Sequence, residues 1–266
     1  MKNIIVKILL IILISVIPAY NIKGLLTDGN IVHSVDVDNK FEEKLSLIDA
    51  KDIEKTISSL VDDRQAQREK ERVEQERKKT LERITKQIKE GKVDYKKELK
   101  NTLIVGDSLM NALQLYKIID DSAIISMVSA NFSHLEDNYD TIVSNNPVRL
   151  VLHYGINMCE PAQARREAYI SRYTEIVKRL KKDLPDTTIY ISGIFNVSSV
   201  AAEKFPCVAD YNADVKSMCK KLGIEYLDNS KCFPADERYY GSDGIHLKKE
   251  FYSDQWLPNL LLTFYS

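Results

Sequence analysis

Residues 101–266 alternate short apolar runs with longer helix-like stretches, and this alternation limits the folds that the chain can adopt. The apolar runs cover residues 102–106, 123–128, 149–155, 187–193 and 224–227. Between them, residues 161–182 carry apolar side chains at helical spacing, and residues 206–222 are a second helix-like stretch. Strands that alternate with helices form a parallel sheet covered on both faces. We therefore expect an α/β domain with a parallel sheet of about five strands.

Residues 1–20 predict a membrane segment. Lys2 and Lys7 precede an apolar run that extends from Ile8 to Ala19. Because a bilayer span needs about 20 apolar residues, this run is a short span. We favour an uncleaved signal anchor, with a cleaved signal peptide ending near Ala19 as the alternative. In both cases the lysines stay on the cytoplasmic side of the membrane and the remaining chain is exported. The protein is then a single-pass membrane protein or a secreted one.

Residues 21–100 predict a juxtamembrane segment followed by a charged helix, which we call the stalk. Residues 62–90 include 18 charged residues of both signs among 29 and no Gly or Pro, so this segment predicts a solvated helix. Gly91 is expected to end it. Apolar residues recur at the spacing of an interrupted coiled-coil seam, which leaves a dimer through the stalk open: Ile53, Ile57, Leu60, Val73, Leu81, Ile84 and Ile88. The balanced charge, −1 overall, argues against a nucleic-acid partner.

Ser108 follows the first predicted strand directly, after Gly106 and Asp107. One interpretation is a simple turn in which Asp107 or Ser108 caps the next helix. The other is a nucleophile, since ligands of parallel sheets bind at the carboxyl ends of strands and helix N-termini favour negative charge. A nucleophilic serine needs a base, so the histidines decide between these interpretations.

The chain has four histidines, and His246 is the one best placed to act as a base. Asp243 precedes it by three residues, a spacing that brings both side chains to one face of a helical turn. The alternative is a helix cap with a chance histidine. His33 lies in the juxtamembrane segment, His134 is expected near the surface, and His153 is expected to be a satisfied core residue.

Asn157 lies two residues after Gly155, at the end of the third predicted strand. Its amide can stabilise a developing oxyanion, although a turn asparagine is the plainer interpretation. Taken in order along residues 100–266, Gly106-Asp107-Ser108-Leu109, Gly155-Ile156-Asn157 and Asp243-Gly244-Ile245-His246 resemble the blocks of the SGNH family, also called GDSL-type hydrolases. Two features depart from the family pattern. Met158 replaces the aspartate that usually follows the asparagine, and residues 128–135 lack the glycine of the second block.

The resemblance implies a flavodoxin-like three-layer α/β/α sandwich and a serine acyl-transfer enzyme. It implies catalysis by Ser108, His246 and Asp243, and an oxyanion hole made by the Ser108 N–H, a second-block N–H and the Asn157 amide. Ala130 is the favoured second-block position and Ser129 the alternative. No metal or organic cofactor is expected.

Together with the predicted export, the resemblance implies an O-acetyl ester of a cell-wall glycan or polysaccharide as the substrate, and it leaves an esterase and an acetyltransferase both open. Lipolytic or thioesterase activity is the first alternative to this substrate. A non-catalytic glycan-binding or scaffold module is the second.

All four cysteines fall in residues 101–266: Cys159, Cys207, Cys219 and Cys232. Export would permit disulfide bonds, and buried free thiols are equally compatible with the sequence. Cys207 and Cys219 are expected on one helix, too far apart to bridge each other. The spacing matches no zinc motif, and the sequence assigns no pair.

Overall fold

The computed structural model describes residues 50–233 and 237–266. The predicted membrane segment and the juxtamembrane residues 21–49 lie outside the described residues. The chain divides into two compact units, Met1–Arg68 and Glu69–Ser266, and helix α3 (Ala50–Lys89) contributes to both. Among the described residues, no helix is long and apolar enough to cross a membrane.

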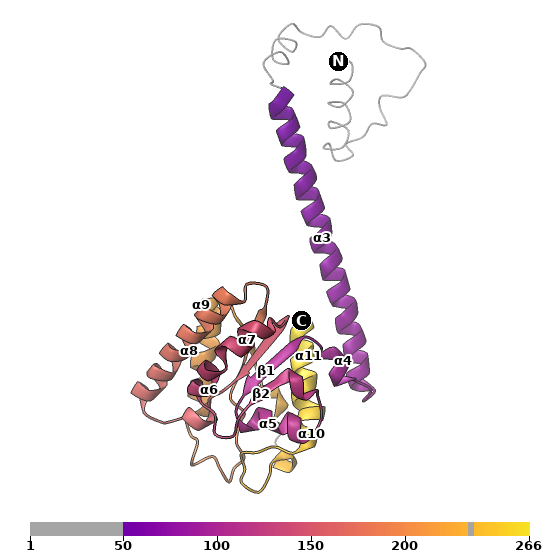
Figure 1. Ribbon diagram of the computed structural model, residues 1–266. Coiled ribbons are helices and arrows are strands. Elements are labelled where there is room, and N and C mark those ends of the chain that lie inside the picture. The colour runs from indigo at the N-terminus through magenta and orange to yellow at the C-terminus, as the bar shows by residue number, and fades with distance from the viewer. Residues whose placement is uncertain (1–49, 234–236) are drawn as a thin grey trace, which may run out of the picture. The chain divides into compact units, whose positions relative to one another are not determined.

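Five parallel strands form a single sheet in the order β2-β1-β3-β4-β5. Figure 1 shows β1 and its neighbour β2. The strands are β1 (Thr102–Gly106), β2 (Ile124–Ser126), β3 (Arg149–His153), β4 (Thr188–Ser192) and β5 (Glu225–Leu227). Each lies within one of the five predicted apolar runs. This strand order is the flavodoxin-like one, in which ligands bind where the order reverses, between β1 and β3. The predicted α/β fold with a five-stranded parallel sheet is confirmed.

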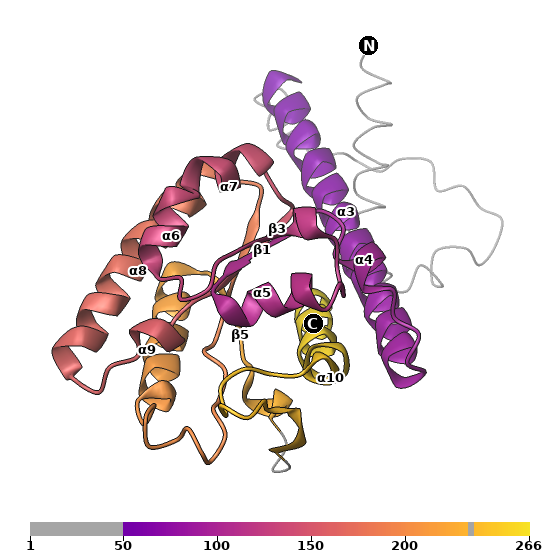
Figure 2. The ribbon, with the colours of Figure 1, turned by 60° about the horizontal axis from the view of Figure 1, so that its bottom comes forward.

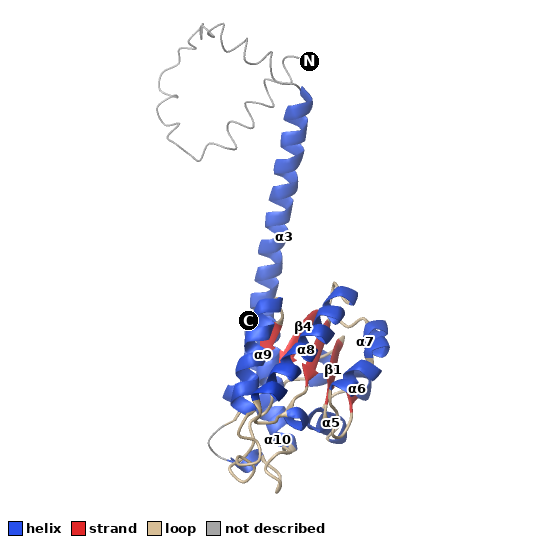
Figure 3. Ribbon diagram, turned by 90° about the vertical axis from the view of Figure 1, so that its left-hand side faces the viewer, coloured by secondary structure: helices blue, strands red, loops and turns tan. Residues whose placement is uncertain are grey.

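Helices cover both faces of the sheet (Figures 2 and 3). Figure 2 shows α6, α8 and α9 on one face and α5 and α11 on the other. The helices that follow α3 are α4 (Tyr95–Glu98), α5 (Ser108–Leu115), α6 (Phe132–Asp137), α7 (Tyr139–Asn145), α8 (Gln163–Asp183), α9 (Val208–Leu222), α10 (Lys249–Phe251) and α11 (Leu257–Tyr265). Short 3-10 turns are η2 (Asp121–Ala123), η3 (Ile156–Met158), η4 (Ser230–Cys232) and η5 (Glu237–Tyr239), and η6 (Tyr252–Trp256) is a π-helical turn.

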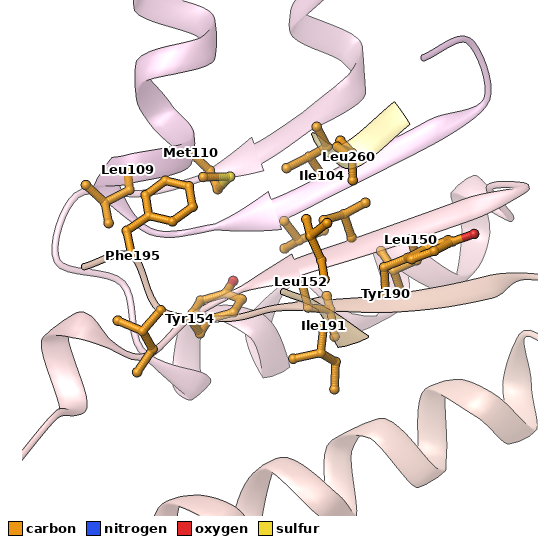
Figure 4. Packing of buried hydrophobic residues seen from close by; sticks show 14 of the residues in the cluster. Ile104, Leu109, Met110, Leu150, Leu152, Tyr154, Tyr190, Ile191, Phe195 and Leu260 are labelled. Atoms are coloured by element: carbon orange, nitrogen blue, oxygen red, sulfur yellow. The ribbon is translucent and has the colours of Figure 1, made fainter. Parts of the chain in front are cut away.

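The central strands are buried on both faces, which explains why they are continuous apolar runs rather than alternating ones. All five residues of β1 are buried, as are the last four of β3. Figure 4 shows Leu109, Met110 and Phe195 gathered at one end of this core. Phe195 contacts the rings of Phe251 and Trp256, so α10 and η6 pack against this part of the core.

The C-terminal part of α3 is built into the α/β unit. Ile84 is fully buried in the same core as Leu99, and Arg83 forms a hydrogen-bonded ion pair with Glu98 at 2.6 Å. The compact unit therefore begins at Glu69 and extends beyond the predicted domain, which began at residue 101. Because Ile84 and Ile88 pack against the chain's own core, this part of the predicted coiled-coil seam already has a partner.

Candidate active site

The last residue of β1 is a glycine, Gly106, because the backbone there lies too close to its neighbours for a side chain. A Cβ atom at this position would lie 2.6 Å from the His153 carbonyl oxygen and 2.5 Å from Met110 Cγ. Gly106 is also the register partner of His153, so β1 and β3 end level with each other. The residues that follow the two strands are therefore brought to the same edge of the sheet.

Asp107, not Ser108, caps helix α5. Its Oδ1 accepts a hydrogen bond from the Leu109 N–H at 3.0 Å, and its backbone is extended as N-cap residues require. Ser108 is the first residue of the helix. Its side chain is thus not used for capping, and its own N–H occupies a position that has no intrahelical acceptor.

Ser108, His246 and Asp243 form a continuous hydrogen-bonded chain. His246 Nε2 lies 3.1 Å from Ser108 Oγ, and His246 Nδ1 lies 2.6 Å from Asp243 Oδ2. The other carboxylate oxygen of Asp243 accepts hydrogen bonds from the backbone N–H groups of Ile245 and His246, each at 3.0 Å. Two residues that are 138 positions apart are therefore joined in one chain, in the order hydroxyl, imidazole, carboxylate.

The turn that holds Asp243 and His246 is not the helical turn that the sequence predicts. The next helix after it, α10, begins at Lys249, and Gly244 has a left-handed φ of 70°. The Asp243 carboxylate bonds to the two N–H groups that follow it, and this closes the turn. The Gly244 carbonyl accepts from the Ser198 N–H at 2.8 Å, which ties the turn to the loop after β4.

The hydrogen bonds around Asp243 favour its ionised form. Burial by itself would raise the pKa of Asp243. The hydrogen bonds from His246 and from the two backbone N–H groups outweigh burial and lower the pKa to about 2. An ionised carboxylate can only accept, so it holds the proton of the imidazole on Nδ1. Nε2 is then left as the acceptor facing Ser108 Oγ.

Asp107 has the opposite electrostatic character, and no local sequence pattern indicates it. Its side chain is fully buried, and its Oδ2 atom has no hydrogen-bond partner among the described residues. Burial raises the pKa of Asp107 to about 7, with the Leu109 N–H and the nearby His246 acting against the rise. Near neutral pH this carboxyl group therefore stays substantially protonated.

The three predicted oxyanion-hole residues lie on the segments that follow β1, β2 and β3. The Asn157 side chain donates to the Ala130 carbonyl at 3.0 Å, which joins the second and third of these segments. An amide nitrogen carries two N–H groups, so one remains after this bond. The Ala130 N–H donates to the Met127 carbonyl at 3.2 Å, so an oxyanion at Ala130 would have to share that donor.

The missing glycine of the second block has a structural explanation. Ser129 has a left-handed φ of 59°, whereas Ala130 is not among the described residues with positive φ. Because the unusual backbone conformation falls on Ser129, position 130 can carry a Cβ atom without strain. The substitution leaves the backbone N–H of Ala130 in place.

The other described histidines are both core residues. His153 is buried, bonds through Nδ1 to Ser192 Oγ at 3.0 Å, and has a pKa lowered to about 3 by burial. Its prediction as a satisfied core histidine is confirmed. The expectation that His134 lies near the surface is wrong, because its Nδ1 bonds to the buried Tyr154 hydroxyl at 2.7 Å. His33 lies outside the described residues.

Exposed apolar side chains lie on two segments that border the site. Met127 and Val128 follow β2, and the Met127 N–H donates to the Gly106 carbonyl at 3.3 Å. Val200 is 74% exposed and lies against Gly244, the glycine of the turn that holds Asp243 and His246. No sequence pattern indicates these residues, because the loop after β4 and the Asp243–His246 turn meet only in the folded chain. The described residues contain no group of three or more His, Cys, Asp or Glu that could hold a metal ion.

Comparisons with known proteins identify the fold. No protein-family model and no curated protein matches the sequence. Among solved structures, a candidate GDSL-like lipase from Parabacteroides merdae superimposes with a TM-score of 0.50 at 16% identity, over 62% of this chain and 94% of that one. The fold expected from the three sequence blocks, that of GDSL-type hydrolases, is thereby confirmed.

Two further structures are similar at lower TM-scores. A GDSL-like lipase from Bacteroides thetaiotaomicron has a TM-score of 0.48 at 11% identity, over 68% of this chain and 96% of that one. An acetyl xylan esterase variant from Geobacillus stearothermophilus has a TM-score of 0.45 at 13% identity, over 60% of this chain and 93% of that one.

Proposed function

We propose that this protein is a serine-dependent acyl-transfer enzyme that cleaves carboxylic esters. The observation that carries the proposal is the hydrogen-bonded chain from Ser108 Oγ through His246 to Asp243. A serine is a weak nucleophile unless a base takes its proton, and a third group must orient that base. Here the acceptor nitrogen faces the serine and the carboxylate fixes the tautomer.

In the proposed reaction, Ser108 Oγ attacks the ester carbonyl while His246 Nε2 takes the hydroxyl proton. His246 then donates this proton to the departing alkoxide, which leaves an acyl group on Ser108. Water, or a hydroxyl group of an acceptor, attacks the acyl-serine with His246 again as base, and the serine is restored. Asp243 stays ionised throughout and stabilises the imidazolium.

The negative charge of the tetrahedral intermediate needs donors at the same edge of the sheet. The Ser108 N–H stands at the N-terminus of α5, where the helix dipole favours an anion. The second N–H of the Asn157 amide and the Ala130 N–H are the further proposed donors. Each such preorganised donor typically lowers the free energy of the transition state by about 3 to 4 kcal/mol.

We propose an O-acetyl group of a cell-wall glycan or polysaccharide as the substrate. The N-terminal apolar segment with its lysines supports export of the catalytic unit and attachment to a membrane. The family that the sequence blocks resemble includes esterases and acetyltransferases of such glycans. Both an esterase and a transferase use the same acyl-serine, and they differ only in the acceptor.

A longer apolar acyl group is a second candidate, because exposed apolar side chains border the site. Met127, Val128 and Val200 are 50%, 66% and 74% exposed. Contact with an aliphatic chain would remove these side chains from water, which favours binding by roughly 25 cal/mol per Å² of apolar surface. This feature favours lipolytic activity over the removal of acetyl groups.

The test uses residues 69–266, the whole second compact unit, with p-nitrophenyl acetate, butyrate and octanoate and a serine-reactive fluorophosphonate. We expect hydrolysis and labelling, and we expect Ser108→Ala to abolish both. Ser171→Ala, which changes an exposed serine of α8, is the matched control and should behave as wild type.

The chain-length series separates the two substrate candidates. A rate that is highest with acetate supports deacetylation, and a rate that rises toward octanoate supports the lipolytic candidate. Acetylated glycan with and without an acceptor then separates esterase from transferase. A folded wild-type protein that shows neither hydrolysis nor labelling would favour the non-catalytic glycan-binding or scaffold module.

A further inference from the structure

Cys159 and Cys207 lie side by side although 48 residues separate them. Their Sγ atoms are 2.6 Å apart, and both side chains are buried. The structure describes both as thiols. A disulfide bond has an S–S length of about 2.05 Å, so a small movement of either side chain brings the two sulfurs to bonding distance.

Both cysteines occupy positions that matter for the candidate active site. Cys159 ends the 3-10 turn η3, whose central residue is Asn157. Cys207 is the N-cap residue of α9. A bond between them would fasten the segment that follows Asn157 to the first turn of a helix that packs on β5 and α8.

A second contact already joins the same two segments. Tyr211 lies one turn along α9 from Cys207, and its hydroxyl is within 3.1 Å of the Met158 carbonyl. The same hydroxyl accepts a hydrogen bond from the Glu160 N–H at 3.2 Å. The residues immediately after Asn157 are thus held at two points of α9, one polar and one through the paired sulfurs.

We propose that Cys159 and Cys207 form an intrachain disulfide bond that fixes the Asn157 turn against α9. The part of this proposal that concerns Asn157 rests on the proposed function, whereas the bond itself does not. The required oxidant is another disulfide, either of a small thiol such as glutathione or of a dithiol oxidase.

The bond forms by two successive exchanges. One cysteine thiolate attacks the oxidant disulfide, which gives a mixed disulfide and releases one thiol. The second cysteine thiolate displaces the remaining half of the oxidant. The two cysteines lose two protons and two electrons in total, and the two released thiols carry them. Because both sulfurs are buried in the folded chain, the exchange belongs to folding.

The bond is tested first by mass. Full-length protein is refolded in a glutathione redox buffer, denatured, and alkylated with iodoacetamide before and after reduction. Of the four cysteines, we expect two to be alkylated before reduction and four after it, with the peptides around Cys159 and Cys207 linked. The Cys219→Ser/Cys232→Ser variant is the matched control, with none alkylated before reduction and two after. Four alkylated cysteines in the unreduced wild type would overturn the proposal.

The positioning role is tested by kinetics with p-nitrophenyl acetate. We expect refolding in the presence of a reductant, or the Cys159→Ala/Cys207→Ala double substitution, to lower kcat about tenfold with a smaller change in KM, because the Asn157 donor is misplaced. In an Asn157→Ala background the same change should have no further effect on kcat. An equal loss in both backgrounds would overturn the role in positioning Asn157. A linked but inactive wild-type protein would overturn the proposed function and leave the bond standing.

Discussion

Asp243 and Asp107 show how the same side chain acquires different protonation states on one sheet edge. Asp243 accepts hydrogen bonds from His246 and from two backbone N–H groups, and these hold it ionised. Asp107 is buried, and one of its oxygens has no hydrogen-bond partner among the described residues, so its neutral form is favoured. The first carboxyl group is suited to orienting an imidazole, and the second to capping α5.

Asp243→Asn should lower kcat by about 10²- to 10⁴-fold while the protein stays folded. The amide can still accept from the backbone N–H groups through its oxygen, but it cannot hold the proton of His246 on Nδ1 as a carboxylate does. The measurement is kcat at pH 7 together with the rate of fluorophosphonate labelling. Asp186→Asn, in an exposed turn, is the control. Wild-type activity in Asp243→Asn would contradict the assigned role.

Asp107 should make the protein less stable as the pH rises from about 4 to 7. Its pKa is 3.8 when unperturbed and about 7 in the folded protein. Between these values the folded state binds more protons than the unfolded state, so the free energy of unfolding falls with rising pH and is constant above the window. Each pKa unit corresponds to about 1.4 kcal/mol, so the total is on the order of 4 kcal/mol.

Asp107→Asn tests this pH dependence, because asparagine keeps the cap and cannot ionise. Urea unfolding at pH 4, 5.5, 7 and 8 should show a smaller loss of stability in the variant than in wild type. Asp243 affects stability at lower pH than this range. Its ionised carboxylate stabilises the folded state, and this contribution is lost as the pH falls from 3.8 toward 2. The same pH dependence in both proteins would show that Asp107 does not titrate there.

At the scale of elements, α3 has two different environments. Residues 58–79 are exposed on every side, and Val73 is 51% exposed. Near the end of this exposed stretch, the Arg77 guanidinium donates to the Tyr265 carbonyl at 3.3 Å. Further along the helix, Ile84 is fully buried. Among the described side chains of the predicted seam, Leu60 and Val73 are exposed. A stalk dimer therefore remains a proposal.

Ile84→Ala should destabilise the α/β unit by about 2 to 5 kcal/mol, because it removes buried methyl groups and leaves a cavity. Val73→Ala is the matched control on the exposed part of the same helix, and its effect should stay within about 0.5 kcal/mol. Both changes are measured by urea unfolding of residues 69–266. Equal effects of the two substitutions would show that the end of α3 does not belong to the folded unit.

At the scale of the whole molecule, attachment to a membrane is expected to depend on residues 1–20. The full chain should sediment with membranes and resist alkaline carbonate extraction. A chain that begins at residue 21 should remain in the supernatant with unchanged kcat on p-nitrophenyl acetate. Sedimentation of the shortened chain with membranes would contradict the anchor, and loss of the full chain's N-terminus on export would favour the cleaved signal peptide.

The fold could be predicted largely from the sequence, and the candidate site in part. Runs of buried strand residues separated by amphipathic helices leave few arrangements other than a covered parallel sheet. Ser108, Asp243 and His246 could be proposed because the blocks that contain them occur in the order that resembles the SGNH family. The neighbours of Ala130 and the burial of His134 could not be predicted from the sequence, because both depend on segments that meet only after folding.

The sequence by itself determined the five strands and the end of β1 at Gly106, since these follow from local apolar patterns. The residues that carry the proposed chemistry could be proposed because the sequence blocks that contain them resemble those of the SGNH family. The tertiary structure alone decided that Asp107 rather than Ser108 caps α5, that α3 ends inside the core, and that Cys159 meets Cys207. Each of these outcomes depends on contacts or hydrogen-bond geometry that exist only once the chain is packed. Local patterns specify which elements form, and the way those elements pack determines which side chains meet.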